Sequence, residues 1–159
     1  MALDAQTIAA LREALDDEFC ARATYRKVIE AFGPVQPFVN IVEAEDRHAE
    51  ALLALFAKFG INPPEDTWPD RVTAPATLAD ACRAAVEAEI ANEAMYERLL
   101  AGISDPDVLT VMRRLQQASQ ERHLPSFRRC LERETGGSRT TEGQRQTGPR
   151  QRRIHRRGH

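Results

Sequence analysis

The fold is decided by residues 30–56, which read EAFGPVQPFVNIVEAEDRHAEALLALF. Gly33 and Pro34 end one helical pattern, and apolar residues then return at intervals of three and four, which predicts a helix over about residues 37–59. Because the turn between the two helices is short, we expect them to be antiparallel neighbours. The inward stripe of the second helix is Phe38, Ile41, Glu45, His48, Leu52 and Phe56.

The segment before this turn has the same helical period. Asp4 is a suitable N-cap, and the pattern continues to Phe32. Its inward positions are Ile8, Leu11, Leu15, Glu18, Arg22, Tyr25, Ile29 and Phe32.

Two further helices are predicted in the second half of the chain. Thr77 is a suitable N-cap for a helix that ends near Ser104. Asp105 and Pro106 then begin a fourth helix, which continues to about Glu134. The inward positions are Cys82, Val86, Glu89, Glu93, Tyr96 and Leu100 on the third helix, and Leu109, Met112, Gln116, Gln120, His123, Phe127 and Leu131 on the fourth. A proline inside the fourth helix, Pro125, predicts a kink.

Residues 61–76, INPPEDTWPDRVTAPA, form a proline-rich connection without helical period. At about 3.3 Å per residue this segment reaches roughly 50 Å, which exceeds the roughly 35 Å length of a 23-residue helix. It can therefore run the whole length of a bundle. Two helical hairpins joined by one long crossover predict an all-α, antiparallel four-helix bundle of the ferritin-like kind over residues 1–135.

Residues 136–159 have a different composition, rich in Gly, Arg, Gln and Thr, with seven Arg against a single Glu. Residues 1–135 contain 15 Lys and Arg against 23 Asp and Glu. We expect the basic tail to be disordered, because it has almost no apolar residue to bury. It could bind nucleic-acid phosphates weakly, but it has no aromatic residue for base stacking, so nucleic acid is not an expected partner.

Composition excludes several other classes. No apolar run approaches the roughly 20 residues that span a bilayer, and the first residues, MALDAQTIAALREALDDE, are acidic where a secretory signal is basic. We therefore expect a soluble, cytoplasmic protein without a membrane partner. Cys20, Cys82 and Cys130 form no C-x-x-C pair, so we expect three reduced packing residues rather than a disulfide framework or a zinc site.

The first and third helices contain an internal repeat. Residues 18–25, EFCARATY, align with residues 89–96, EIANEAMY, and in each segment an inward Glu precedes a Tyr by seven residues. The chain contains only these two tyrosines. The sequence therefore resembles a duplicated helical hairpin. Glu18 lies about 14 residues before its turn, or about 21 Å, and His48 lies about as far beyond it, so the two should share one depth.

Inward carboxylates gathered at one depth repel one another unless a cation lies among them. The sequence Glu45-Asp-Arg-His48 presents two metal ligands on one helical face. The predicted metal ligands are Glu18, Glu45, His48, Glu89 and His123.

The second hairpin departs from the first at Gln120, which stands three residues before His123, where a second Glu-x-x-His motif would have its Glu. Glu93, one turn beyond Glu89, is the alternative extra carboxylate. Glu93 and Gln120 are therefore left open as additional ligands. An ion pair between Arg22 and Glu93 would compete with the ligand role of Glu93.

With these residues the chain resembles the ferritin-like di-iron carboxylate superfamily, which includes rubrerythrin and bacterioferritin. Residues 30–56 and residues 121–133, ERHLPSFRRCLER, resemble an uncharacterised branch of small ferritin-like proteins. The resemblance covers about residues 5–135. It implies a metal-binding bundle that holds two iron ions, or manganese, with oxidoreductase activity of a peroxidase or ferroxidase type. A rubredoxin domain is missing, which implies an external electron donor, and assembly into a homo-oligomer is left open.

The roles of the two tyrosines are also open from the sequence. Tyr25 and Tyr96 are either core residues with satisfied hydroxyls or neighbours that hydrogen-bond the metal ligands or donate electrons. No catalytic residue is assigned. Two competing functions remain: a metal-free helical interaction module, and a metal store without turnover.

Overall fold

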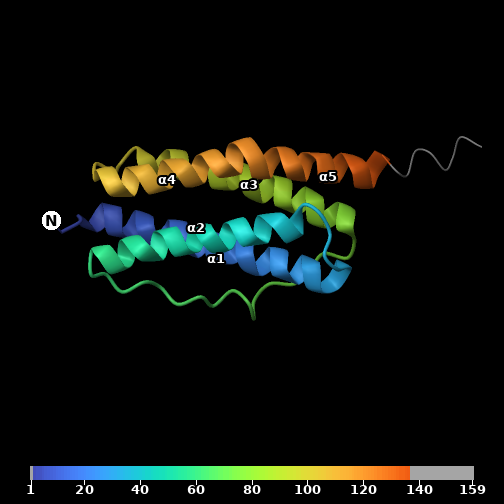
Figure 1. Ribbon diagram of the computed structural model, residues 1–159, viewed down its shortest axis with the longest axis horizontal. Coiled ribbons are helices and arrows are strands. Elements are labelled where there is room, and N and C mark those ends of the chain that lie inside the picture. Colours follow the sequence, from blue (N-terminus) through green and yellow to red (C-terminus); the bar gives the residue numbers. More distant parts are fainter. Residues whose placement is uncertain (1, 137–159) are drawn as a thin grey trace, which may run out of the picture.

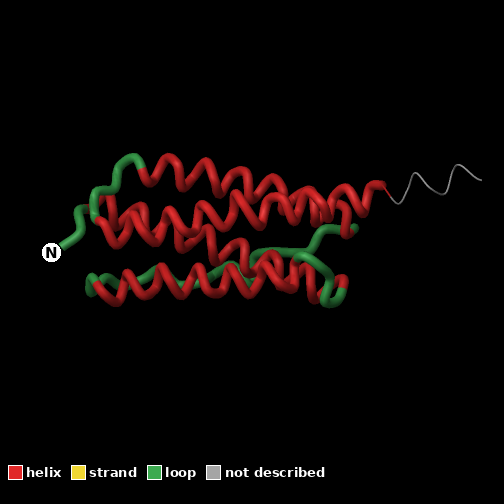
Figure 2. Tube along the Cα trace, turned by 45° about the horizontal axis from the view of Figure 1, so that its top comes forward, coloured by secondary structure: helices red, strands yellow, loops and turns green. Residues whose placement is uncertain are grey.

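The computed structural model describes residues 2–136, which form a bundle of helices (Figures 1 and 2). This confirms the predicted all-helical bundle, and residues 2–136 contain no strand. The expectation of a disordered tail over residues 136–159 lies outside the described residues except at Gly136, which is helical. No helix in the described part is long and apolar enough to cross a membrane. The helices are α1 (Ala5–Phe32), α2 (Phe38–Lys58), α3 (Leu78–Leu100), α4 (Pro106–Ala118) and α5 (Leu124–Gly136), with a π-helical turn, η1 (Ser119–His123), between the last two.

The path of the chain can be followed by colour in Figure 1. Helix α1 leads from the end that holds the N-terminus to the opposite end, and α2 leads back. The connection over residues 59–77 then passes along the bundle to the start of α3, and α4, η1 and α5 form one long helix. The connection is held against α1, where Arg12 donates to the carbonyl of Asn62 at 2.9 Å and Trp68 Nε1 donates to Asp16 at 2.9 Å.

The helix ends follow the local signals in the sequence. The side chains of Asp4, Thr77 and Asp105 each accept a hydrogen bond from a backbone N–H in the first turn of their helix, which confirms the three predicted N-caps. Beyond α1 and α2, Gly33 and Gly60 have φ values of 84° and 65°. This left-handed region costs glycine little, so both helices end there.

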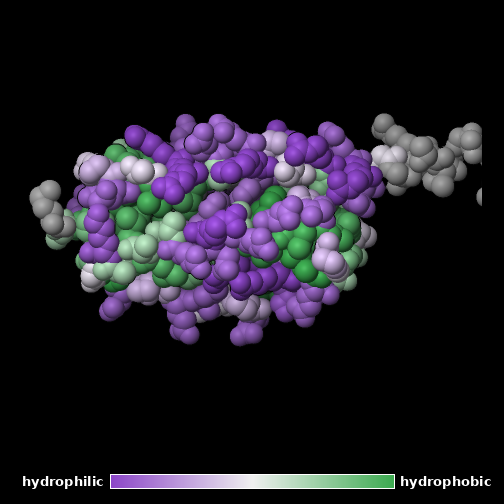
Figure 3. Space-filling view, viewed as in Figure 1, coloured by the Kyte–Doolittle hydropathy of each residue, from purple (hydrophilic) through white to green (hydrophobic). Residues whose placement is uncertain are grey.

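Two apolar clusters fill the bundle, one on either side of a polar layer. The first includes Leu11, Leu15, Leu52, Phe56 and Met112. The second includes Val28, Phe38, Ala85 and Phe127. On the face drawn in Figure 3, hydrophilic residues crowd the middle and hydrophobic patches lie on either side. The polar side chains of the middle layer therefore meet between two separate cores.

Cys82 of α3 and Cys130 of α5 are joined by a disulfide inside the second cluster. The prediction of three reduced cysteines was therefore wrong for this pair, and only Cys20 is free among the described residues. The two cysteines are 48 residues apart in sequence, so no local spacing indicated the pairing. The two helices bring their Cα atoms to 5.8 Å, within the usual range for a disulfide.

Breaking the disulfide should lower the free energy of unfolding by about 4 kcal/mol, because the bond closes a loop of nearly 50 residues in the unfolded chain. Urea unfolding with and without reductant measures this difference. Replacing Cys82 and Cys130 together by Ala should reproduce it, whereas Cys20→Ala should leave the midpoint unchanged. A count of three free thiols in the unreduced, unfolded protein would contradict the pairing.

Candidate metal centre

The polar layer of the bundle is built from five side chains on four segments. Helix α1 contributes Glu18, α2 contributes Glu45 and His48, α3 contributes Glu89, and η1 contributes His123. Their oxygen and nitrogen atoms form two groups, each within 4.8 Å: Glu18 with Glu45 and His48, and Glu45 with Glu89 and His123. The structure thus brings all five sequence-predicted side chains to one level of the bundle.

Glu45 belongs to both groups. Its Oε2 lies 3.1 Å from Nδ1 of His48, and its Oε1 lies 3.2 Å from Nδ1 of His123. Glu18 completes the first group at 3.4 Å from His48 Nδ1, and Glu89 completes the second at 3.6 Å from His123 Nδ1. One central carboxylate therefore faces two imidazoles, and each imidazole has a further carboxylate of its own.

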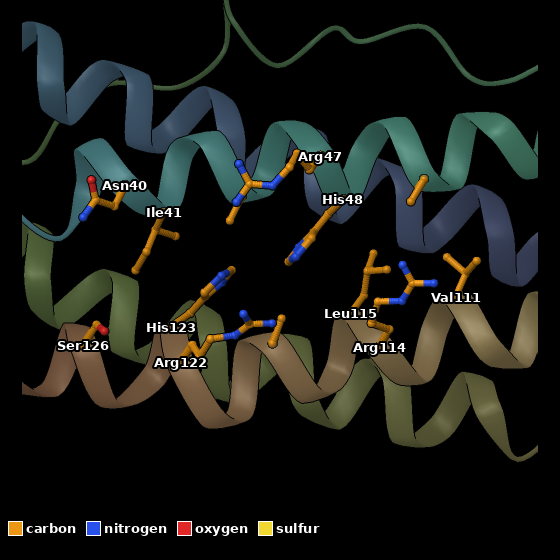
Figure 4. Close-up of a pocket in the computed structure, with 13 residues that line it drawn as sticks. Asn40, Ile41, Arg47, His48, Val111, Arg114, Leu115, Arg122, His123 and Ser126 are labelled. Atoms are coloured by element: carbon orange, nitrogen blue, oxygen red, sulfur yellow. The ribbon is translucent and has the colours of Figure 1, made fainter.

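The two imidazoles lie face to face. Figure 4 shows His48 and His123 pointing toward one another across the space between α2 and the long last helix. Their ring centroids are 5.3 Å apart and their planes differ by 16°. The Nδ1 atom of His123 is buried and has no hydrogen-bond partner in the described part of the chain. The nearest oxygens, those of Glu45 and Glu89, lie at 3.2 Å and 3.6 Å, so either a proton on this nitrogen or a cation between it and the carboxylates would offset the cost of its burial.

The tyrosines of the repeat connect the two halves of the centre. The hydroxyl of Tyr25 on α1 donates to Glu89 on α3 at 2.9 Å, and the hydroxyl of Tyr96 on α3 donates to Glu18 on α1 at 2.6 Å. Each tyrosine thus orients the glutamate of the other hairpin. Both rings are buried, so the structure gives these residues core packing and a hydrogen bond to the centre at the same time.

The π-helical turn η1 makes the two halves unequal. It spans Ser119–His123 and ends two residues before Pro125, which has no N–H to donate. The wide turn brings Ser119, not Gln120, next to the centre, and the Ser119 hydroxyl donates to Glu89 Oε2. The irregularity that Pro125 predicted is therefore a π turn.

Glu93 and Gln120, the two residues left open as additional ligands, lie outside both groups. Gln120 is exposed and its Nε2 donates to Glu93 Oε1 at 2.8 Å. The alternative ion pair between Arg22 and Glu93 does not form either, because Arg22 pairs with Asp46 at 2.7 Å and with Asp66 at 2.9 Å. In these three interactions Arg22, Glu93 and Gln120 contact residues outside the two groups or one another.

Burial and mutual proximity shift the pKa values of four of these side chains, Glu18, Glu45, His48 and His123. Burial raises the pKa of Glu18 to about 7, and the nearby charge of Glu45 adds to the rise. Burial alone would lower the pKa values of the histidines, but the facing carboxylates outweigh it and raise them to about 9 for His48 and about 10 for His123. The same contacts lower the pKa of Glu45 despite its burial. Without a metal the centre therefore holds protons.

Two more polar residues lie beside the centre that the sequence did not single out. Asn92 Nδ2 donates to Asp17 at 2.7 Å, and both residues line a cavity of about 140 Å³ that also touches Glu45 and Glu89. Burial raises the pKa of Asp17 to about 6. The available signals were weak: Asp17 only adjoins Glu18, Asn92 follows Glu89 by three residues, and Ser119 was hidden by the assumption of an unbroken α-helix.

Comparison with known proteins establishes the fold alone. The structure is similar to the crystal structure of a hypothetical protein from Methanococcus jannaschii DSM 2661, with a TM-score of 0.76, 21% sequence identity and coverage of 85% of each chain. No protein-family model and no curated protein matches the sequence.

Proposed function

We propose that the polar layer binds two divalent transition-metal ions, iron or manganese, and that the protein is a ferritin-like oxidoreductase of the peroxidase or ferroxidase type. One ion would be held by Glu18, Glu45 and His48, and the other by Glu45, Glu89 and His123. The single observation that carries the proposal is the position of Glu45, with one carboxylate oxygen toward each histidine. A carboxylate shared in this way can bridge two cations.

The donor set supports these metals over others. Three carboxylates and two imidazoles form a set of oxygen and nitrogen ligands without thiolate, which suits iron and manganese better than copper(I). The glutamates and histidines come from four helical segments, as in the ferritin-like carboxylate proteins, where two helices each supply a Glu and two each supply a Glu-x-x-His. We also propose that the bundle has the ferritin-like topology, in which two antiparallel hairpins are joined by one long crossover. The second motif is incomplete here because Gln120 stands in the place of its Glu, and η1 presents Ser119 to the centre.

The chain's own residues would bind, orient and hold protons. Bound iron would supply electrons to peroxide or dioxygen, and an external donor would return them. Glu18 and Glu89 would be kept in position by the phenol groups of Tyr96 and Tyr25. The two apolar clusters border the layer at both ends, which lowers the local dielectric constant and strengthens electrostatic interactions there.

Metal analysis of protein purified without chelator, and again after anaerobic reconstitution with ferrous iron, tests the proposal. We expect about two ions per chain in the parent and none in the Glu45→Ala, His48→Ala variant. A parent that holds neither iron nor manganese after reconstitution rejects the metal centre and favours the metal-free interaction module. If the ferrous protein binds two ions but consumes no peroxide or dioxygen, the protein is a metal store.

Ser119→Ala should lower the affinity of the metal site at His123 by about 10-fold to 100-fold, because Glu89 loses an orienting hydrogen bond. The affinity of the site at His48 should stay nearly unchanged. Tyr96→Phe should lower the affinity of the site at His48 and leave the site at His123 nearly unchanged, because it removes the hydrogen bond to Glu18. Stepwise titration with Co²⁺, followed by its visible absorption, measures each site. Equal weakening of both ions by each variant would contradict this assignment.

A further inference from the structure

A cavity of about 380 Å³ opens onto the two histidines from one side of the bundle. It lies between α2 and the helix formed by α4, η1 and α5, and His48 and His123 line it together (Figure 4). Small-molecule sites typically measure about 300–1,000 Å³. The cavity is therefore large enough for a small organic molecule and leads to the proposed metal centre.

The walls of this cavity are mainly apolar. Aliphatic side chains come from both sides, and Asn40 and Ser126 are the only uncharged polar residues at its lining. A molecule with a hydrocarbon body would displace water from these walls, which is favourable by about 25 cal/mol for each Å² of apolar surface removed from water. The aliphatic lining residues are Ile41, Ala44, Ala51, Val111, Leu115 and Ala118.

The charged lining residues of the cavity all carry positive groups or imidazoles. Arg47 extends from α2, and Arg114 and Arg122 extend from the opposite helix (Figure 4). The three arginines are exposed, and none forms an ion pair with a carboxylate within residues 2–136. No Asp or Glu lines this cavity. The mouth therefore presents three guanidinium groups whose hydrogen-bond donors are available to a ligand.

The smaller cavity on the other side of the centre has the opposite character. It is lined by Asp17, Glu45 and Glu89 and by no Arg, Lys or His. Of these two cavities within residues 2–136, only the larger is lined by positively charged groups, and a ligand that carries negative charge would favour it.

We propose that the 380 Å³ cavity binds a small amphiphilic organic anion, such as a monocarboxylate of about eight carbons. Its carboxylate would lie among Arg47, Arg114 and Arg122, where guanidinium groups can hold it through paired hydrogen bonds. Its hydrocarbon body would lie against the aliphatic walls, which include Ile41 on one side of the two histidines and Leu115 on the other. The inference rests on the proposed function only for the view that the ligand meets a metal centre, because binding itself needs no metal.

Calorimetric titration with octanoate tests this inference, with octanol as the neutral analogue and inorganic phosphate as an anion without an apolar body. We expect one octanoate per chain, bound at least about tenfold more tightly than either analogue. The affinity should fall as salt rises, because the guanidinium groups are exposed to screening. If octanol binds as tightly as octanoate, the proposed recognition of the negative charge is wrong. If phosphate binds as tightly as octanoate, the proposed recognition of the apolar chain is wrong.

The Arg114→Gln, Arg122→Gln double variant should bind octanoate roughly fivefold more weakly or worse, since two exposed charge interactions are lost. A matched control is Arg113→Gln with Arg128→Gln, which removes the same charge from exposed positions of the same long helix that line neither cavity. Arg47→Gln on α2 gives an independent second test. Equal weakening by the control pair would show nonspecific attraction and overturn the inference.

Titrations of the metal-free and the metal-loaded protein separate this inference from the proposed function. Octanoate binding to protein that takes up no metal would keep the cavity assignment and reject the metal centre. Metal uptake without octanoate binding in either form would reject the cavity assignment and keep the metal centre. If both assignments hold, octanoate should also change the absorption spectrum of the Co²⁺-loaded protein, because its body reaches the side of His48 and His123.

Discussion

Glu45→Ala is expected to abolish the binding of both metal ions, with a loss of affinity of more than about 100-fold at each site. The reason is that Glu45 is the one carboxylate that faces both histidines, at 3.1 Å and 3.2 Å. Glu18→Ala should remove only the ion beside His48, because Glu18 belongs to one group. Metal content after ferrous reconstitution and Co²⁺ titration measure both outcomes.

A matched control for this experiment is Glu50→Ala, an exposed glutamate on the same helix. It should retain two ions. Glu45→Gln provides a second test that keeps the side-chain shape and leaves only a neutral, weaker ligand, and it should also lose both ions. Circular dichroism of each metal-free variant verifies the bundle. Two ions bound by folded Glu45→Ala would rule out a shared carboxylate.

The second large effect is a steep dependence of metal affinity on pH. The pKa values of His48 and His123, about 9 and about 10, mean that both imidazoles are protonated near neutral pH without metal. Each ion must displace one of these protons, so the affinity for the pair of ions should fall about 100-fold for each unit of pH lowered between about pH 8 and about pH 7. Titrations with metal at several pH values measure this slope, and an indicator in weak buffer measures the protons released. A metal affinity that stays flat over this range would contradict the displacement of imidazolium protons.

The metal-free protein should show the opposite trend in stability. The folded pKa of His48 lies above the ordinary value of 6.5, so its contribution to stability is complete below about pH 6.5 and is lost as pH rises through about 9. Glu18 acts in the same direction, because its pKa is raised from 4.5 to about 7 and its ionisation in a buried place is unfavourable. Thermal unfolding of the metal-free protein should therefore occur at lower temperature as pH rises from about 4.5 to about 9, through Glu18 in the lower part of this range and through His48 in the upper part. His48→Gln should make this decline smaller and release one proton fewer on metal binding.

Much of the fold followed from local sequence. The stripes with a period near 3.6 predicted four helical segments, and Asp4, Thr77 and Asp105 marked three of their starts. The same stripes indicated which polar residues point inward. Because a helix rises regularly, residue counts from each turn were enough to predict that Glu18 and His48 would share one depth, and both lie in one group.

Other features depended on contacts between distant segments. The bond between Cys82 and Cys130 crosses 48 residues, and no spacing rule indicates which helices will meet there. The π turn moved Gln120 to the surface and brought Ser119 to Glu89, because Pro125 disrupts the regular hydrogen-bond pattern that residue counting assumes.

The sequence by itself determined the helices and the set of five inward polar residues, since these depend on periodicity within single segments. Only the tertiary structure decided that Glu45 is shared between two histidines, that each tyrosine serves the opposite hairpin, and that three arginines surround one approach to the centre. These relations depend on how far apart the helices lie and how each is rotated about its axis. Packing of whole side chains fixes both quantities, and no single segment encodes them.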